Sequence, residues 1–163
     1  MDKEQRRFEG RHFIEDMGLL FEQGGHPRMA GRILGALLIA KPPYQSATQL
    51  ADTLQASKGS LSTMTRLLLQ MGLIERVGLP GHRSDYFRIK PGAWTALVRQ
   101  TVYELTAMRQ LAERGLELID NEDTDTREGL AEAHDLYGFL EREYPLLIEQ
   151  WEKERQTTLR KKK

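Results

Sequence analysis

The chain has 163 residues, of which 39% are hydrophobic and 29% charged, and it contains no cysteine. This composition excludes an intrinsically disordered chain, and the lack of cysteine excludes disulfide bridges and thiolate metal sites. The longest apolar run, residues 33–40, is too short to cross a bilayer, and the charged N-terminus leads into no signal-peptide core. We therefore expect a cytoplasmic protein without a membrane partner.

Charge is distributed unevenly along the chain, although the totals are equal, with 24 basic and 24 acidic side chains. Residues 46–100 carry seven Lys and Arg against three Asp and Glu, whereas residues 101–163 carry ten against fifteen. A basic middle region is what a phosphate-binding module needs. The excess is modest, so charge supports a nucleic-acid partner without identifying one.

Hydrophobic periodicity predicts two helices at the start of the chain. The first covers about residues 5–23 and ends at the helix-breaking run of residues 24–27. The second, residues 28–40, is apolar on most sides. A helix that is apolar on most sides is buried, so we expect this one to be the central element of the core.

Capping residues define two further helices. Ser46 and Gln49 have the spacing of a capping box at the start of a two-turn helix. After a short break, Ser57 can cap a second helix that runs to Met71, and Gly72 can adopt the left-handed conformation that ends it. Two short helices joined by a tight turn indicate a helix-turn-helix.

Two β-rich segments follow, residues 73–77 and 85–89, separated by a turn-rich loop. A hairpin directly after the second helix of a helix-turn-helix is a wing. From residue 91 onward, apolar residues recur every three or four positions and predict helices to the end, apart from a polar break at residues 121–125. Pro145 lies within the last helix, and we expect it to kink or split that helix.

These elements predict a mainly α protein with a small β wing, a winged helix-turn-helix with dimerisation helices at both ends. We expect an N-terminal dimerisation helix over residues 1–27, a DNA-binding module over residues 28–91 and a C-terminal helical dimerisation region over residues 92–163, forming one intertwined domain. The flanking helices carry more large apolar residues than one helix pair can cover, which favours a homodimer. A helical hairpin within one chain is the alternative.

The helix over residues 58–71 has a face that suits the major groove. Its inner stripe is apolar and consists of Leu61, Met64, Leu68 and Met71. Its outer face is small, polar and basic, without a carboxylate, and consists of Gly59, Ser62, Thr63, Arg66 and Gln70. Short side chains allow close approach, hydroxyl groups bond base edges, and arginine binds guanine bidentately. The alternative is a solvated surface helix, but such helices usually carry glutamates.

We therefore expect this helix to contact double-stranded DNA. The residues assigned to DNA contact are those at its start and along its outer face: Ser57, Lys58, Gly59, Ser60, Ser62, Thr63 and Arg66. In a dimer, the two recognition helices should lie one helical turn of DNA apart, about 34–36 Å. His82 and Arg83 form a cationic wing tip that can enter the adjacent minor groove, although an ordinary solvated hairpin is the alternative.

Several stretches resemble the multiple-antibiotic-resistance (MarR) regulators. They are FE at residues 21–22, RMAGRILG at 28–35, ASKGSLST at 56–63, MGLIERV at 71–77 and GHRSDYF at 81–87. Within that family, the chain is most similar to the branch related to glycine betaine synthesis regulators, over nearly its full length. One difference concerns the wing, where the common family pattern Asp-Arg-Arg is replaced by His82-Arg83-Ser84.

The resemblance implies a dimer with interlocking terminal helices, bound to a pseudo-palindromic operator. It also implies a repressor that small, often lipophilic or phenolic, effectors release from DNA. By position, the residues expected around an effector pocket are Phe13, Met17, Phe21, Leu37, Trp94 and Val98. Aromatic residues and methionine at helical spacing are more often core than pocket, so the six remain candidates.

No catalytic or metal site is expected. The four histidines, at positions 12, 26, 82 and 134, lack a recognised metal-ligand spacing, and the glycine-rich runs lack the strand and helix that a phosphate loop needs. We therefore predict a protein that is not an enzyme and has no cofactor. The main alternative function is a winged-helix module for protein interaction, since fold does not fix function, and a metal-dependent switch is a third possibility.

Overall fold

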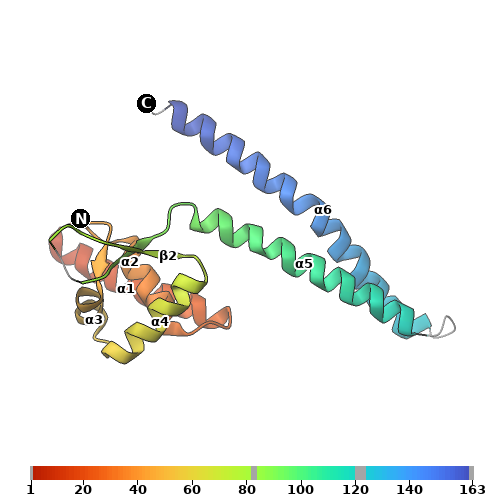
Figure 1. The fold of residues 1–163 in the computed structure, drawn as a ribbon, viewed down its shortest axis with the longest axis horizontal. Coiled ribbons are helices and arrows are strands. Elements are labelled where there is room, and N and C mark those ends of the chain that lie inside the picture. The colour runs from red at the N-terminus through yellow and green to blue at the C-terminus, as the bar shows by residue number, and fades with distance from the viewer. Residues whose placement is uncertain (1, 82–83, 120–123, 162–163) are drawn as a thin grey trace. The chain divides into compact units, whose positions relative to one another are not determined.

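The computed structural model (Figure 1) describes residues 2–81, 84–119 and 124–161. The chain consists of two compact units, residues 1–94 and residues 95–163, and each is described by itself. The elements in chain order are α1 (Lys3–Gln23), α2 (Arg28–Leu38), β1 (Gln45–Ser46), α3 (Ala47–Leu54), α4 (Lys58–Gln70), β2 (Ile74–Val77), β3 (Tyr86–Ile89), α5 (Ala93–Leu118) and α6 (Thr124–Lys161). The predicted order of helices, helix-turn-helix and wing is confirmed.

Helices α1 and α2 pack against each other more closely than ordinary side chains allow. A Cβ on Gly35 would lie 3.1 Å from the Met17 Cβ and 3.2 Å from the Ile14 Cα. In the same way, a Cβ on Gly31 would lie 2.9 Å from the Gly18 Cα. Because glycine has no side chain, the two backbones approach directly, and α1 is part of the first unit's core.

The capping groups predicted for the helix-turn-helix are present. The Ser46 hydroxyl accepts from the Gln49 amide at 3.1 Å, and the Gln49 side chain accepts from the Ser46 amide at 2.8 Å. The Ser57 side chain accepts from the Ser60 amide at the start of α4. Helix α3 ends at Leu54, and the residue that caps it, Gln55, has a left-handed conformation with φ 49°.

Helix α4 ends as the sequence predicts. Gly72 has φ 69°, its amide donates to the Leu69 carbonyl at 3.0 Å, and the Leu73 amide donates to the Leu68 carbonyl at 3.0 Å. These two bonds form a Schellman motif, which satisfies carbonyl groups at the end of the helix. The chain therefore turns sharply into the wing.

The wing belongs to a three-stranded antiparallel sheet with the strand order β1-β3-β2. The predicted hairpin of β2 and β3 is present, and it pairs Val77 with Tyr86 and Ile74 with Ile89. Strand β1 was not predicted, and it pairs Ser46 with Tyr86. A strand of two residues is too short to show a periodic pattern, which is why the sequence did not indicate it. Ser46 therefore has two functions, since it ends β1 and caps α3.

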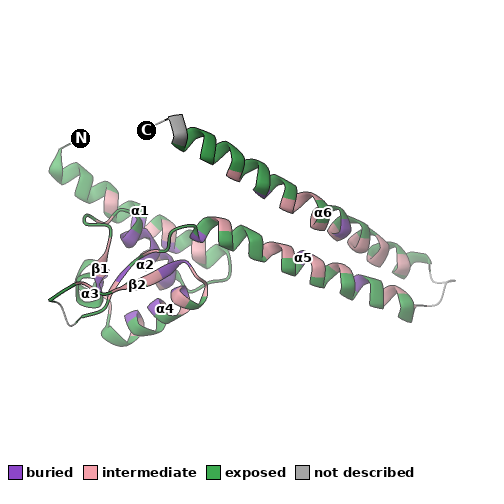
Figure 2. Cartoon of the chain, turned by 45° about the horizontal axis from the view of Figure 1, so that its top comes forward, coloured by how far each residue is buried: buried purple, intermediate pink, exposed green. Residues whose placement is uncertain are grey.

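The core of the first unit lies around α2, the purple helix of Figure 2. Ala30, Ile33 and Leu34 are completely buried, which confirms the prediction that this helix is the central element. The core is completed by residues of the other elements: Leu50 and Leu54 of α3, Leu61 and Leu68 of α4, Leu73 just before β2, and Ile74 and Phe87 of the sheet. The helix-turn-helix and the wing are thereby fixed to the same hydrophobic centre.

The second unit contains α6 and most of α5. Leu105, Ala112 and Ile148 are buried in it. Helix α6 runs without interruption through Pro145, so of the two predicted alternatives, a kink or a split, the split does not occur. A proline removes one backbone hydrogen bond, and the bonds of the flanking turns maintain the helix.

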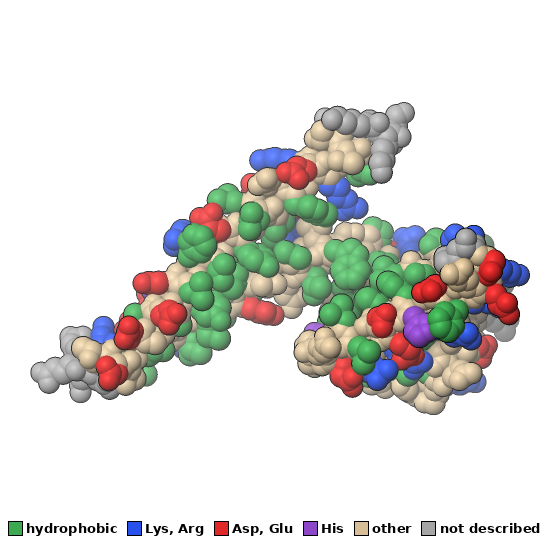
Figure 3. Space-filling view, turned by 180° about the vertical axis from the view of Figure 1, so that it is seen from behind, with side chains coloured by type: hydrophobic (Ala, Val, Ile, Leu, Met, Phe, Trp, Pro, Cys, Tyr) green, Lys and Arg blue, Asp and Glu red, His purple; other side chains and the backbone are tan. Residues whose placement is uncertain are grey.

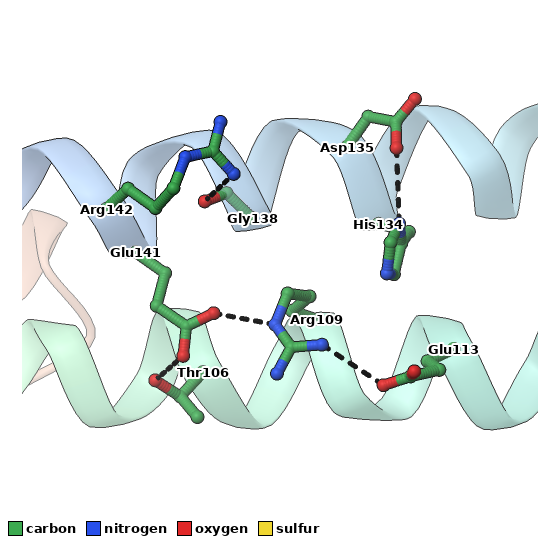
Figure 4. A network of polar contacts seen from close by, with 8 residues as sticks. All are labelled: Thr106, Arg109, Glu113, His134, Asp135, Gly138, Glu141 and Arg142. Atoms are coloured by element: carbon green, nitrogen blue, oxygen red, sulfur yellow. Dashed lines mark hydrogen bonds and ion pairs between the residues drawn. The ribbon is translucent and has the colours of Figure 1, made fainter.

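Polar contacts hold α5 and α6 together between the apolar positions (Figure 4). Glu141 of α6 accepts from the Thr106 hydroxyl at 2.7 Å and from Arg109 Nε at 2.6 Å. Arg109 also bonds Glu113 on its own helix at 3.1 Å. The hydrogen bonds from Thr106 and Arg109 hold the pKa of Glu141 below its ordinary value. This network fixes one register of α5 against α6.

Among the described residues, no helix is both long enough and apolar enough to span a membrane.

Candidate DNA interface

The outer face of α4 is exposed along its whole length. Ser57, Lys58, Gly59, Ser62, Thr63, Arg66 and Gln70 are exposed, and Ser60 is half-buried. Within the described chain, no ion pair occupies the Arg66 guanidinium. The helix thus presents two basic side chains, Lys58 and Arg66, among short polar ones.

The inner face of α4 differs from the prediction at one position. Leu61 and Leu68 are buried as predicted, Met64 and Met71 are half-buried and pack against the core, and Thr65, which the predicted stripe does not include, is buried at 5% exposure. The Thr65 hydroxyl donates to the Leu61 carbonyl at 2.9 Å. An internal hydrogen bond lets a threonine replace an apolar residue in the core, and the hydrophobic pattern alone does not reveal it.

A surface hollow of about 500 Å³ lies between α3, α4 and the wing. Its walls carry both charges, since Lys58, Arg66 and Arg76 line it together with Asp52 and Asp85. The remaining lining residues are Ala47, Thr48, Ala51, Leu61, Ser62, Thr65, Ser84 and Phe87. Three of the residues assigned to DNA contact, Lys58, Ser62 and Arg66, therefore surround one depression beside the wing.

The strands of the wing carry cross-strand ion pairs. Arg88 Nε lies 2.6 Å from Glu75 Oε1, and Arg76 Nε lies 3.7 Å from Asp85 Oδ2. These partners reduce the positive charge that the strands can offer to phosphate. His82 and Arg83, the predicted wing tip, lie outside the described residues.

The six residues predicted around an effector pocket have different environments. Leu37 is buried in the core at 3% exposure, and Met17 and Phe21 pack against that core. Phe13, Trp94 and Val98 are exposed at 38%, 44% and 39%. Val98 belongs to the second unit and the other five to the first, so the pocket stays a prediction.

The described part of the chain contains no group of three or more metal-ligating side chains arranged to hold a metal ion. Two histidines have ordinary neighbours there. His12 packs edge-on against Phe8 with a centroid distance of 4.4 Å, and His134 Nδ1 lies 3.2 Å from the carboxylate of the adjacent Asp135.

The second unit leaves many large apolar side chains exposed. Figure 3 shows them gathered along the helical unit. On α5 they include Leu97, Tyr103, Met108, Leu111 and Leu118, and on α6 they include Leu136, Phe139, Leu146, Leu147 and Trp151. Among the described residues of this unit, three apolar ones (Leu105, Ala112 and Ile148) are buried, so pairing of α5 with α6 covers a small part of the apolar surface.

Comparisons with known proteins identify the family. A family model described as an MmpR5-like MarR family transcriptional regulator matches residues 92–154, and one described as the MarR family matches residues 25–83. The HTH-type transcriptional regulator MmpR5 of Mycobacterium tuberculosis is 39% identical over 129 residues, which cover 79% of this chain and 78% of that protein.

Two further relatives agree with this assignment. The putative HTH-type transcriptional regulator YvaV of Bacillus subtilis is 29% identical over 79 residues, 48% of this chain and 44% of that protein. A crystal structure of a transcriptional regulator is 34% identical, with a TM-score of 0.74, and covers 89% of this chain and 99% of its own. The narrower resemblance to glycine betaine synthesis regulators is not confirmed. This chain belongs to the MarR family of transcriptional regulators.

Proposed function

We propose that the protein is a homodimeric, sequence-specific DNA-binding regulator that recognises a pseudo-palindromic operator. It acts as a repressor, and a small lipophilic or aromatic effector releases it. The observation that carries the DNA-binding part is the outer face of α4, which is exposed, basic and free of carboxylates between Lys58 and Gln70.

The side chains of α4 differ in what they can offer to a base. Arg66 has five hydrogen-bond donors, which suit the two acceptors of guanine in the major groove. The Thr63 hydroxyl donates to the Gly59 carbonyl at 3.1 Å, so its oxygen remains available as an acceptor. Such an acceptor matches the amino group of adenine or cytosine. Ser62, Thr63 and Arg66 together would read the groove, and Arg83 would enter the minor groove beside it.

The proposed homodimer is supported by the apolar surface of the second unit. Large side chains that stay exposed on both α5 and α6 mark an interaction surface. A second copy of the same chain offers the same apolar faces, and this self-complementarity is what a two-fold interface requires. The two copies would then present two α4 helices to the two halves of an operator.

The test is binding of the purified protein to the duplex upstream of its own gene, with a scrambled duplex as the competitor, over a series of salt concentrations. We expect a preference of about a thousandfold or more for the upstream duplex and a steep loss of affinity as salt rises. Binding to neither duplex would instead support the protein-interaction function. Addition of a lipophilic phenol should lower operator affinity if the effector prediction is correct.

The role of Arg66 needs a variant with a matched control. Arg66→Ala should weaken operator binding by about 1–3 kcal/mol and relax specificity at one position in each half-site. Arg114→Ala removes the same charge from an exposed position of α5 and should leave both quantities unchanged. Equal affinity and specificity in the two variants would remove Arg66 from the proposed readout.

A further inference from the structure

Arg32 connects three helices of the first unit through a single guanidinium group. Its Nε donates to Glu15 Oε1 of α1 at 2.8 Å, and its Nη2 donates to the Leu54 carbonyl at the end of α3 at 3.2 Å. Its Nη1 lies 3.7 Å from the Met29 sulfur on its own helix. The Arg32 side chain is 22% exposed, so its hydrogen bonds are partly shielded from solvent.

The Leu54 carbonyl lies at the start of the turn that joins α3 to α4. Leu54 is the last residue of α3, Gln55 follows in the left-handed conformation, and Ser57 caps α4 two residues later. Carbonyl groups at the end of a helix lack partners within the helix. Arg32 supplies one, and it thereby holds the turn that leads into the recognition helix.

The other end of the connection is anchored in α1. A Cβ on Gly18 would lie 2.8 Å from Arg32 Cγ, so the arginine stem lies against the α1 backbone. Glu15 is held from a second side, because Arg28 Nη2 donates to its other oxygen at 3.0 Å. The anchor is therefore part of the rigid α1–α2 pair.

A hollow of about 410 Å³ lies between α1 and the end of α3, and both Glu15 and Arg32 line it. Its remaining lining residues are Arg11, Ile14, Thr53, Leu54 and Gln55. The Glu15–Arg32–Leu54 bridge crosses this gap, which the side chains do not fill.

We propose that Arg32 is a positioning residue for DNA recognition. It fixes the turn between α3 and α4 to the α1–α2 pair and so sets the position of the recognition helix, without contacting DNA itself. This inference depends on the proposed DNA-binding function. The hydrogen bonds of Arg32 to Glu15 and to the Leu54 carbonyl also link the position of α1 to that of α4.

Two variants distinguish a positioning role of Arg32 from an effect of its charge. Arg32→Met and Arg28→Met each remove one positive charge from α2 and one bond to Glu15, but only Arg32→Met removes the bond to Leu54. We expect Arg32→Met to weaken operator binding about tenfold or more, with an unchanged salt dependence and unchanged affinity for the scrambled duplex. Arg28→Met should lose less than about threefold.

Equal losses in the two variants would overturn the proposal, since they would show an effect of charge alone. A fall of about one in the slope of log affinity against log salt, seen only with Arg32→Met, would also overturn it, because it would place Arg32 on a phosphate. If Arg32→Met does not fold, Arg32→Lys replaces it. Lysine keeps the charge but concentrates its donors on one atom, so operator affinity should still fall. Wild-type affinity in Arg32→Lys would contradict the proposal.

Hydrogen exchange provides a readout that does not require DNA. The amides of Gln55 and Ala56 bond carbonyls near the end of α3. They should exchange faster in Arg32→Met than in Arg28→Met, while the amides within α2 keep their protection. Equal exchange in both variants would overturn the positioning role. A wild-type protein without operator preference would contradict the proposed function, and the exchange result would still test Arg32.

Discussion

Gly31 of α2 lies against the backbone of Met17 of α1, so closely that a Cβ on Gly31 would overlap the Met17 carbonyl oxygen. The same Cβ would lie 2.8 Å from the Phe21 Cβ. Both obstacles are rigid, because one is backbone and the other is the first atom of a side chain. The contact explains how α1, a largely polar helix in which Ile14 and Gly18 are buried, is held on the winged module.

Gly31→Ala should therefore destabilise the protein by about 2–3 kcal/mol or more, since a core without free space must shift its backbone to admit a methyl group. Denaturant unfolding monitored by circular dichroism measures this. Gly129→Ala is the matched control, because it makes the same change in a helix where a Cβ meets nothing within 4 Å. A Gly31→Ala protein as stable as Gly129→Ala would contradict the close packing.

Gly59→Ala should separate stability from DNA affinity. Gly59 lies in the first turn of α4, and a Cβ there meets nothing within 4 Å, so alanine should raise stability by up to about 1 kcal/mol. The same methyl group would point toward a bound duplex if the outer face enters the major groove. We expect a higher melting temperature together with weaker operator binding. Unchanged or tighter binding would exclude Gly59 from the close contact.

Local patterns allowed much of the helix-turn-helix to be predicted from sequence. The Ser46–Gln49 capping box, the Ser57 cap and the left-handed Gly72 depend on residues within a few positions of one another, so their geometry follows from spacing. The exposed face of α4 followed in the same way from helical periodicity. Of the kink or split expected at Pro145, the split does not occur, because the rest of a long helix outweighs one missing bond.

Other features depend on partners far apart in the chain. Strand β1 pairs with β3 about forty residues later, and two residues carry no periodicity that would show it. The Arg32 bridge joins residues 15, 32 and 54, and an arginine on a helix gives no sign of which carbonyl it will meet. The glycines of α1 and α2 were visible in the sequence, but their mutual contact requires the packed pair.

The Glu15 carboxylate predicts a dependence of stability on pH. Its partial burial acts in the opposite direction, but the hydrogen bond from Arg28 and the charge of Arg32 hold the pKa of Glu15 below its ordinary value of 4.5. A group whose pKa is lowered by folding adds stability above its unfolded pKa, and this stability is lost as pH falls through the folded pKa.

We therefore expect the wild type to exceed Glu15→Gln in unfolding free energy by a constant amount above about pH 5, and by less and less at lower pH. Urea denaturation of both proteins over a pH series measures the difference. Glu9→Gln is the control, since Glu9 is an exposed carboxylate on the same helix. A difference that grows as pH falls would contradict the ion pairs of Glu15.

Leu111→Glu tests the apolar surface of α5 as a subunit interface. Leu111 is 55% exposed in the single chain, and burial against a partner would make a carboxylate there costly because it would lose its water. We expect sedimentation to show a dimer for the wild type and mostly monomer for the variant at the same concentration. Gln110→Glu adds the same charge at the neighbouring exposed position and should remain dimeric. If Leu111→Glu also remains dimeric, the interface lies on other residues. If the wild type is monomeric, each recognition helix meets its half-site alone, and the two-fold operator prediction fails with it.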